Sequence, residues 1–447
     1  MRLPRHAPSL KTLINSDPEA LITVFASQTP IDAEVSGEYL HWDLLRSTPP
    51  KGLSTERWWL SIKFARNAGR QSLDLLDKSG KPFSIALSDS MLRRLHFLDR
   101  EAAGNILGIT RGEDQELHKG HLIRSLIEEA MTSSQLEGAS TTRVVAKEML
   151  RTGRAPRDRS ESMIFNNYHA MRQIQQWYGE PLTLEKILDI HQIICGDTLD
   201  DPTCVGRFRR RDEAIQVYDR NDGTLLHDPP PAHELEARIK SLCTFANSIE
   251  SNKFLHPIVR AICLHFQIGH DHPFVDGNGR VARALFYWAM GRSGYWLTQF
   301  LSISSVLRKA PKQYALAYLW TEDDESDLGY FVDHQLRVLE LAVEGFRGYV
   351  KRKTEVREQA KRLLKANSKL AAMLNHRQRA LLLHALKNPT QFYRIAEHQG
   401  IHQVSYQTAR SDLLDLAGMN FVRKVREGKA FAFQAVPELA KRMKLDQ

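Results

Sequence analysis

The chain has 447 residues, of which 42% are hydrophobic and 26% charged, without collagen-like or low-complexity bias. This composition excludes a fibrous chain and predicts about two to four globular domains. Because no apolar run is long enough to cross a bilayer and residues 1–17 lack the apolar core of a signal peptide, we expect a cytoplasmic protein with no membrane partner.

Charge and cysteine usage narrow the class of protein further. Residues 351–447 hold 20 Lys and Arg against 8 Asp and Glu, a net charge of +12, whereas the rest of the chain holds 42 against 45, a net charge of −3. Such asymmetry is typical of an appendage that binds a polyanion. No CxxC spacing occurs, so we expect buried thiols in a reducing compartment and neither a disulfide framework nor a zinc site. The cysteines are Cys195, Cys204, Cys243 and Cys263.

The first third of the chain has mainly helical patterns. Residues 1–115 predict an N-terminal helical module in which Trp42, Trp58 and Trp59 belong to the core. A long amphipathic helix begins near His121 and ends in Ser-Ser-Gln-Leu-Glu-Gly, residues 133–138. Glycine at the end of an apolar-periodic helix predicts a C-cap. Further helices are expected at residues 158–178 and 182–195.

Two short apolar runs around a glycine-containing turn then predict a β-hairpin. The runs are Ala214–Tyr218 and Thr224–Leu226, and the turn is Asp219–Gly223. Four arginines precede the hairpin and predict either phosphate contacts or a solvated face. They are Arg207, Arg209, Arg210 and Arg211.

The stretch His272–Arg283, HPFVDGNGRVAR, is the most informative part of the chain. Its glycines let backbone N–H groups turn toward an anion, and a helix that begins here adds its positive end. Arg280 and Arg283 are one helical turn apart, so both guanidinium groups can reach the same phosphates. Asp276 is a hard oxygen ligand suited to Mg²⁺, and His272 is the natural proton acceptor. The stretch therefore predicts a polyphosphate site.

This stretch matches the signature of the Fic/Doc family, HPFx[D/E]GNGRxxR, at every defined position, and the chain therefore resembles that family. The resemblance implies a mainly α fold, a Fic-type helical bundle with a β-hairpin flap over the nucleotide. It also implies transfer of AMP from Mg-ATP to a serine, threonine or tyrosine hydroxyl of a target protein. The implied roles are His272 as the base, Asp276 as the Mg²⁺ ligand, and Phe274, Gly277, Asn278, Gly279, Arg280 and Arg283 as nucleotide-binding residues.

The segment at residues 133–138 also resembles the inhibitory motif of the family, [S/T]xxxE[G/N]. The resemblance implies that Glu137 pairs with Arg283 and occupies the space that the γ-phosphate needs. Ser133 would fix the helix, and Gly138 completes the motif. Because the segment precedes the catalytic motif, we expect an N-terminal inhibitory helix near residues 121–138.

The chain departs from the family just before the catalytic motif. Gly-His-Asp at residues 269–271 replaces residues that normally brace the loop, so we expect the preceding helix to span only residues 256–267. After the loop, a helix is expected at residues 280–290. An alternative is a metal-hydrolase cluster formed by His265, His270 and His272, which would leave Asn278, Arg280 and Arg283 without a role.

The C-terminal region predicts a winged helix-turn-helix. Helices are expected at residues 377–386, 394–398 and 406–416, with a turn at 400–405 and two strands between residues 421 and 433. The third helix would read the major groove of double-stranded DNA, and the basic strands would contact phosphates. Candidate DNA contacts are Tyr406, Gln407, Arg410, Arg423, Lys424, Arg426 and Lys429. Asp412 and Asp415 weaken that prediction, and the alternative is a winged helix for protein contact or dimerisation.

Together these patterns predict four parts: an N-terminal module (1–115), a Fic catalytic domain (116–340), a helical connector (341–374) and a winged helix-turn-helix (375–447). We expect an autoinhibited protein adenylyltransferase that uses ATP and Mg²⁺, with the chain itself among the candidate targets, and a homodimer. Other diphosphate-containing donors are alternatives, because the motif binds phosphates and says little about the nucleobase. Two other functions also stay open: a DNA-binding transcriptional regulator whose Fic domain senses nucleotide, and a hydrolase in which Glu137 positions water to remove AMP.

Overall fold

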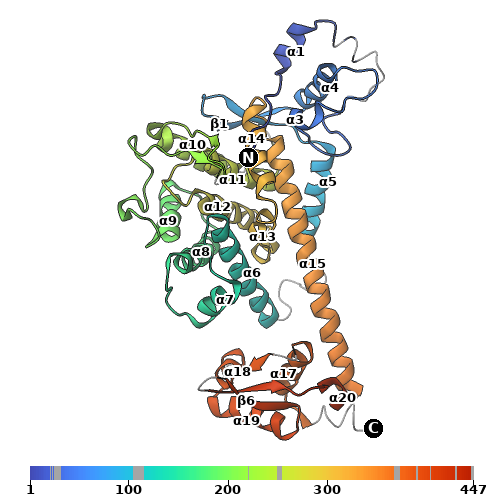
Figure 1. Cartoon of the computed structure of the whole chain (residues 1–447), viewed down its shortest axis with the longest axis vertical. Helices are drawn as coiled ribbons and strands as arrows, with labels where there is room; N and C mark the ends of the chain where they lie inside the picture. The colour runs from blue at the N-terminus through green and yellow to red at the C-terminus, as the bar shows by residue number, and fades with distance from the viewer. Residues whose placement is uncertain are drawn as a thin grey trace. The chain divides into compact units, whose positions relative to one another are not determined.

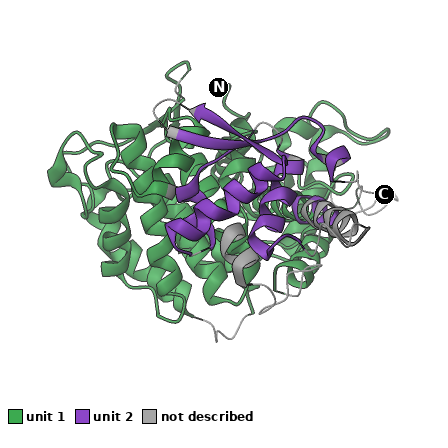
Figure 2. Cartoon of the chain, turned by 90° about the horizontal axis from the view of Figure 1, so that it is seen from below, with its two compact units in different colours: residues 1–347 green, residues 348–447 purple. Residues whose placement is uncertain are grey.

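The protein divides into two compact units, Met1–Arg347 and Gly348–Gln447 (Figure 1 and Figure 2). The structure is a computed structural model that describes residues 1–20, 22, 24, 32–103, 115–219, 221–248, 254–366, 373–388, 391–402, 404–427 and 430–443. Among the helices of these segments, none combines the length and the hydropathy that a membrane span requires.

The first part of unit 1 combines helices with one small sheet. Its elements are α1 (Leu10–Ser16), α3 (Trp42–Leu45), α4 (Thr55–Ala68), β1 (Gln71–Leu76), β2 (Pro82–Ile85), α5 (Asp89–Leu98) and the π-helix η1 (Asp99–Ala103). The antiparallel β1–β2 pair corrects the expectation of a purely helical module. Leu73 and Leu75 are buried while their neighbours on β1 are exposed, and this alternation favours a strand. Trp58 and Trp59 lie in a local core, as predicted, with Trp42 packed against it.

The rest of unit 1 is a helical bundle around two central helices, α11 (Pro257–Asp271) and α12 (Asn278–Arg292), whose residues are nearly all buried (Figure 1). Around them are α6 (Gln115–Leu136), α7 (Arg143–Thr152), α8 (Arg159–Gln176), α9 (Leu184–Cys195) and α10 (Leu235–Asn247). Helices α6, α8 and α9 pack against α12, and α10 packs against α11. The N-cap side chains of Asp158 and Thr183 accept backbone N–H bonds and so set the starts of α8 and α9.

Shorter elements complete unit 1. They are η2 (Pro202–Cys204), β3 (Val217–Tyr218), β4 (Leu225–His227), η3 (Ala232–Glu234), η4 (Trp296–Phe300), α13 (Ile303–Leu307) and α14 (Pro311–Asp323). Strands β3 and β4 form an antiparallel hairpin in which Val217 lies opposite His227 and Tyr218 opposite Leu225. One long helix, α15 (Gly329–Ala366), begins before the predicted helical connector (341–374) and includes most of it.

Helix α11 ends four residues later than predicted, and its extension includes the three residues that depart from the family. A Cβ at Gly269 would lie 2.3 Å from the hydroxyl of Tyr318, so glycine lets the tyrosine pack directly on the helix. The buried side chain of Asp271 accepts hydrogen bonds from Arg238 (3.0 Å) and Gln267 (2.9 Å). Because these polar groups have partners inside the bundle, the helix continues to the catalytic motif.

Unit 2 packs helices against a three-stranded antiparallel sheet. Its elements after α15 are α17 (His376–Lys387), β5 (Phe392–Tyr393), α18 (Ile395–His402), α19 (Tyr406–Gly418), β6 (Val422–Glu427), β7 (Ala430–Ala435) and α20 (Leu439–Arg442). The strand order is β5-β7-β6. On α19, Ala409, Leu413 and Leu416 are buried, as predicted.

Helix α18 also continues past its predicted end. It runs to His402 and so includes Gly400, which was expected to open a turn. Glycine within a helix costs about 1 kcal/mol relative to alanine. The buried His398 of the same helix lies 3.1 Å from a carboxylate oxygen of Asp412, and such tertiary contacts offset that cost.

Candidate functional site

The loop between α11 and α12 is held by its own backbone and by one side chain. His272 ends α11 in the left-handed conformation, with φ 44°. The Asn278 side chain accepts a hydrogen bond from the N–H of Phe274 (2.9 Å) and donates one to its carbonyl (2.8 Å). Gly277 then begins α12 as its N-cap with φ 86°. The loop is therefore tied at both ends to the two central helices.

Gly277 meets two constraints that only glycine satisfies. A Cβ there would lie 2.5 Å from Cys195 Sγ, and its φ disfavours any L side chain. We expect Gly277→Ala to lower the free energy of unfolding by roughly 2–4 kcal/mol. Gly294 has the same φ but open space at its Cβ position, so Gly294→Ala should cost only about 1–2 kcal/mol. Urea titrations of both variants measure the difference, and equal losses would contradict the steric account.

The imidazole of His272 has a defined tautomer. Its Nδ1 lies 2.9 Å from the carbonyl oxygen of Gly269. Because a carbonyl only accepts, Nδ1 carries the proton and Nε2 keeps a lone pair. Burial lowers the pKa of His272 to about 4, against the Gly269 hydrogen bond and the charge of Glu137, which favour protonation. At neutral pH the ring is therefore a neutral base.

A second histidine, His191 on α9, supports the loop and was not found from the sequence. Its ring stacks on Phe274 with centroids 3.8 Å apart and an interplanar angle of 4°. Nε2–H donates to the carbonyl of Asp276 (3.0 Å), and Nδ1 accepts the N–H of Gly206 (3.0 Å). Burial lowers the pKa of His191 to about 4. A lone histidine on a helix has no sequence signal for this role.

These two depressed pKa values predict acid sensitivity. In the unfolded chain a histidine takes up its proton near pH 6.5, but in the folded chain His191 and His272 do so only near pH 4. The stability that these two neutral histidines contribute is therefore present above about pH 6.5 and is lost as the pH falls toward 4. We expect the free energy of unfolding to decrease by roughly 2 kcal/mol per histidine between pH 7 and pH 5. Urea titrations at both values test this, and a profile without slope would contradict it.

The N-terminus of α12 has the features of an anion site. The first N–H groups of a helix have no acceptor within it, and the helix dipole favours negative charge there. The Arg280 side chain is fully buried, donates to the carbonyl of Ile194 (3.3 Å), and leaves Nε and Nη2 without hydrogen bonds among the described residues. A buried guanidinium with two nitrogens that make no hydrogen bond among the described residues suits a phosphate next to a helix N-terminus.

Asp276 lies beside this end of α12 with its carboxylate 42% exposed. One oxygen accepts the N–H of Gly277 (2.5 Å), and the other lies 3.5 Å from Arg280 Nη2. Within the described ranges, no three His, Cys, Asp or Glu side chains could hold a metal ion together. Asp276 therefore fits Mg²⁺ only in the way that Mg²⁺ often binds, with one carboxylate and the remaining ligands from phosphates and water.

Because the described residues contain no such metal-binding group, the metal-hydrolase alternative is excluded. His265 Nε2 lies 2.8 Å from the Tyr314 hydroxyl, and His270 Nδ1 lies 3.1 Å from Asp271. His272 is bound to the Gly269 carbonyl. The three histidines are thus engaged separately and do not share a ligand.

Glu137 reaches the anion site from the end of α6. Arg283 Nη2 donates to its carboxylate (2.7 Å), so the ion pair implied by the resemblance is present. A Cβ at Gly279 would lie 2.2 Å from this carboxylate, which shows how closely the acid covers the first turn of α12. Gly138 has φ 102° after the helix end, as a C-cap glycine does.

Ser133 has a more direct role than expected. We expected it to fix the helix, but its hydroxyl accepts a hydrogen bond from Arg283 Nε (2.8 Å) and its carbonyl one from Arg283 Nη2 (3.0 Å). Arg283 is buried. One residue of α6 and the carboxylate that follows the helix thus satisfy a buried arginine of α12.

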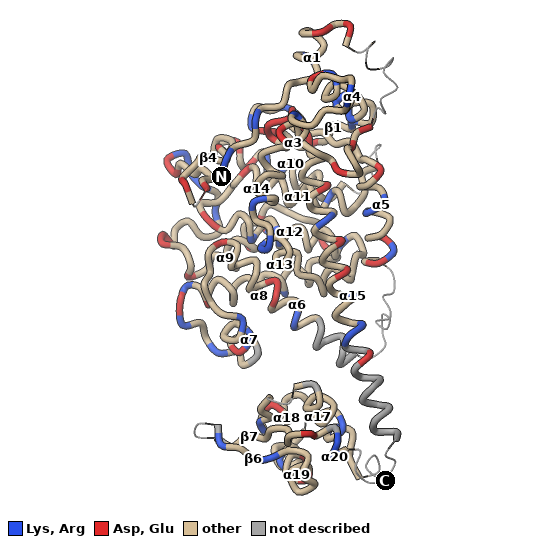
Figure 3. The backbone as a smooth tube through the Cα atoms, turned by 45° about the vertical axis from the view of Figure 1, so that its right-hand side comes forward, with Lys and Arg blue, Asp and Glu red and all other residues tan. Residues whose placement is uncertain are grey.

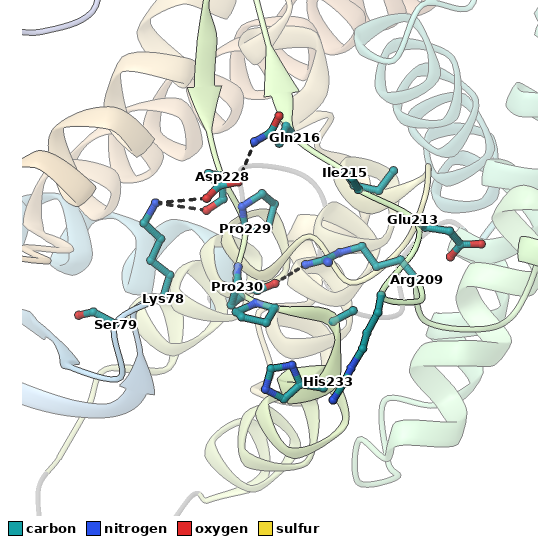
Figure 4. Close-up of a pocket in the computed structure, with 14 residues that line it drawn as sticks. Lys78, Ser79, Arg209, Glu213, Ile215, Gln216, Asp228, Pro229, Pro230 and His233 are labelled. Carbon is teal, nitrogen blue, oxygen red and sulfur yellow. Dashed lines mark hydrogen bonds and ion pairs between the residues drawn. The ribbon is translucent and has the colours of Figure 1, made fainter.

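Side chains at the base of the β3–β4 hairpin contact one another and the backbone. Figure 4 shows Arg209 aimed at the carbonyl of Pro230, and Lys78 and Gln216 both directed at Asp228. A cavity of about 630 Å³ lies at this base. The arginines before the hairpin are not one surface: Arg207 pairs with Glu213 (2.6 Å), and Arg209 is buried.

The candidate DNA contacts of unit 2 lie on its surface. Tyr406, Gln407 and Arg410 are exposed on α19, and Arg423, Lys424 and Arg426 are exposed on β6. Figure 3 colours the lysines and arginines along the backbone blue. Lys429 lies outside the described residues. Asp412, which was expected to weaken DNA binding, faces inward, where it pairs with Arg377 (2.6 Å).

Comparison with known proteins agrees with the motif. A sequence model of the Fic/DOC family matches residues 181–290. The protein adenylyltransferase Fic of Drosophila mojavensis is 38% identical over 114 residues, which cover 26% of this chain and 20% of that protein. The protein of the same name from Drosophila melanogaster is 31% identical over 210 residues, which cover 45% of this chain and 39% of that protein.

A crystal structure of a Fic family protein from Desulfovibrio desulfuricans G20 shares the fold, with a TM-score of 0.51, 16% identity, and coverage of 79% of this chain and 98% of that one. The chain matches only about a fifth to two fifths of the length of the two Drosophila relatives. The motif, the matched segment and the fold agree, and residues 181–290 of this chain match the Fic domain.

Proposed function

We propose that the chain is a protein adenylyltransferase that transfers AMP from ATP to a hydroxyl group of a target protein. The hydroxyl oxygen attacks the α-phosphorus of ATP, its proton passes to Nε2 of His272, and pyrophosphate leaves. The free lone pair on Nε2 and the depressed pKa of His272 support its role as the base. The Drosophila relatives are named protein adenylyltransferase Fic, which supports this reaction.

The observation that carries the proposal is the position of the Glu137 carboxylate. An acid bound to Arg283 and lying over Gly279 occupies the end of α12 that attracts anions. We infer that the terminal phosphate of ATP binds there once Glu137 has left, and that Glu137 is an inhibitor. Nε and Nη2 of Arg280, which make no hydrogen bond among the described residues, would bind the inner phosphates. Asp276 would hold Mg²⁺, which when bound neutralises phosphate charge.

Labelled ATP tests this reaction. The full chain and the Glu137→Gly variant are incubated with Mg²⁺ and ATP labelled at the α or the γ position, with the chain itself as the acceptor. We expect covalent label from the α position alone. Covalent γ label would indicate a kinase, and the absence of both labels from Glu137→Gly would contradict the proposal.

The finer organisation is also part of the proposal. The hairpin β3–β4 would be the flap that lies over the nucleotide, next to the loop that carries His272. Residues 1–115, 116–340, 341–374 and 375–447 would act as N-terminal module, catalytic domain, connector and winged helix-turn-helix. Helices α17, α18 and α19 and the three-stranded sheet of unit 2 support the last assignment.

A second candidate activity is binding of duplex DNA. It is favoured by the way polar side chains are divided between the buried and exposed faces of α19. Its buried face carries Asp412, whereas Tyr406 and Arg410 are exposed. We expect Arg410→Ala to weaken binding to a specific duplex by about 1–3 kcal/mol. Arg423→Ala should weaken binding to all duplexes. It should also reduce the slope of log affinity against log salt concentration by about one. Fluorescence anisotropy at several salt concentrations measures both, and binding that is independent of salt would exclude this activity.

A further inference from the structure

Arg209 is buried behind the catalytic loop and binds it through backbone carbonyls. Its Nε donates to the carbonyl of His272 (2.8 Å), and its Nη2 donates to those of Asp271 (3.4 Å) and Pro230 (2.5 Å). Its backbone N–H donates to the carbonyl of Pro273 (2.9 Å). The side chain is only 8% exposed. Arg209 thus bonds to three consecutive residues at the end of α11.

His227 makes a matching contact one residue earlier on α11. Its Nε2 donates to the carbonyl of His270 (2.6 Å), and its Nδ1 lies 2.9 Å from the carboxylate of Glu322 on α14. His227 is also 8% exposed, and its ring lies against the ring of His270, with centroids 5.1 Å apart. The contact therefore joins β4 to the end of α11.

These two residues flank the hairpin. Arg209 precedes β3, and His227 is the last residue of β4. The last carbonyls of a helix have no partner within it, and they carry the negative end of its dipole, so a cation and an N–H donor are favourable there. The hairpin is therefore attached by both arms to the carbonyls of residues 270–273.

We propose that Arg209 and His227 are positioning residues that hold His272 in its reactive orientation and couple the hairpin to it. His272 has φ 44°, a conformation that persists only where its surroundings impose it. The carbonyls that Arg209 and His227 bind surround this residue and so hold its ring where Nδ1 contacts the Gly269 carbonyl, the contact that sets its tautomer. This inference rests on the proposed function, in which His272 is the base.

Kinetics separate positioning from nucleotide binding. In the Glu137→Gly background, we expect Arg209→Gln to lower the rate of self-labelling at saturating ATP by roughly 10- to 100-fold, since small misplacements of reacting groups have effects of this size. The ATP concentration at half-saturation should change less than about twofold, because Arg209 bonds to the α11 side of the loop and the anion site lies on α12. Arg209→Lys should recover part of the rate, because an ammonium can still reach the His272 carbonyl.

The neighbouring Arg210 provides a matched control. It is exposed, so Arg210→Gln removes the same charge without the carbonyl contacts and should leave the rate unchanged. For the other arm, His227→Gln retains a donor for the His270 carbonyl, and its labelling rate should stay within about threefold of the rate of the Glu137→Gly parent. His227→Leu removes that donor and should reduce the rate about tenfold or more. Equal rates for Arg209→Gln and Arg210→Gln would overturn the inference, as would equal rates for the two His227 variants.

A spectroscopic measurement tests the inference without catalysis. Histidine labelled with ¹⁵N reports the tautomer of each ring, and His272→Ala identifies the His272 signals by difference. We expect a single Nδ1–H tautomer in the unmodified chain and a mixture in Arg209→Gln or, if that variant does not fold, a smaller shift in Arg209→Lys. Unchanged His272 signals would overturn the inference. If the signals change but no variant transfers label, the positioning contacts stand and the proposed adenylyl transfer fails.

Discussion

Replacement of Glu137 by glycine is expected to raise the rate of AMP transfer on the order of 10²-fold. The Glu137 carboxylate holds Arg283 at 2.7 Å and covers the start of α12. Truncating one partner of a buried, hydrogen-bonded charge pair costs about 2–5 kcal/mol, the Glu137 side chain is 23% exposed, which reduces this effect, and about 1.4 kcal/mol corresponds to a factor of ten. Removal of the acid frees Arg283 for a phosphate. Initial rates of α-label incorporation at fixed ATP concentration measure the gain.

Two further variants show whether the charge or the size of the Glu137 side chain inhibits AMP transfer. Glu137→Gln keeps the size of the side chain and removes its charge, so an intermediate rate is expected if the ion pair is the main barrier. Glu128 also lies on α6, but it pairs with Arg143 near the surface, and Glu128→Gln should leave the rate unchanged. A gain from Glu128→Gln equal to that from Glu137→Gly would argue for general loosening of α6.

Removal of the proposed base has the opposite effect. In the Glu137→Gly background, His272→Ala is expected to lower label transfer by about 10²- to 10⁴-fold, the usual contribution of a general base. The affinity for ATP should be retained, because the phosphate contacts come from α12. Equilibrium dialysis with labelled ATP checks affinity, and the labelling rate checks the chemistry.

The pH profile gives an independent check on the same residue. Burial lowers the pKa of His272 to about 4, so its base form is present throughout the neutral range. We expect the rate to be independent of this group above about pH 5 and to fall as the pH approaches 4. His233 is exposed, and His233→Ala should have the profile of its parent. A rate that falls already below pH 7 through His272 would contradict the assigned environment.

Part of this site could be predicted from the chain alone because it is local. The motif from His272 to Arg283 spans one loop and the start of one helix, so its residues are neighbours in any fold that forms these elements. The buried face of α19 was also predicted, since helical spacing alone determines which side chains share a face. Trp58 and Trp59 belong to the core for a similar reason: large apolar rings are buried wherever a core forms.

Other features depend on contacts between distant segments. His191 and Arg209 hold the loop from 85 and 63 residues away in the sequence, and neither belongs to a recognisable motif. The extension of α11 to Asp271 also escaped prediction, because its buried polar residues find partners on α10 and elsewhere in the bundle. Local propensity cannot anticipate such partners.

The amino-acid sequence by itself predicted the anion-binding motif, because short-range spacing encodes it, and its resemblance to the Fic/Doc family implied that Glu137 pairs with Arg283. Only the tertiary structure decided that Arg209 and His227 attach both arms of the hairpin to the end of α11, and that Asp412 faces the interior of unit 2. The physical reason is that a buried polar group takes whichever partner the packing brings within hydrogen-bond distance. That partner depends on the arrangement of whole helices and strands.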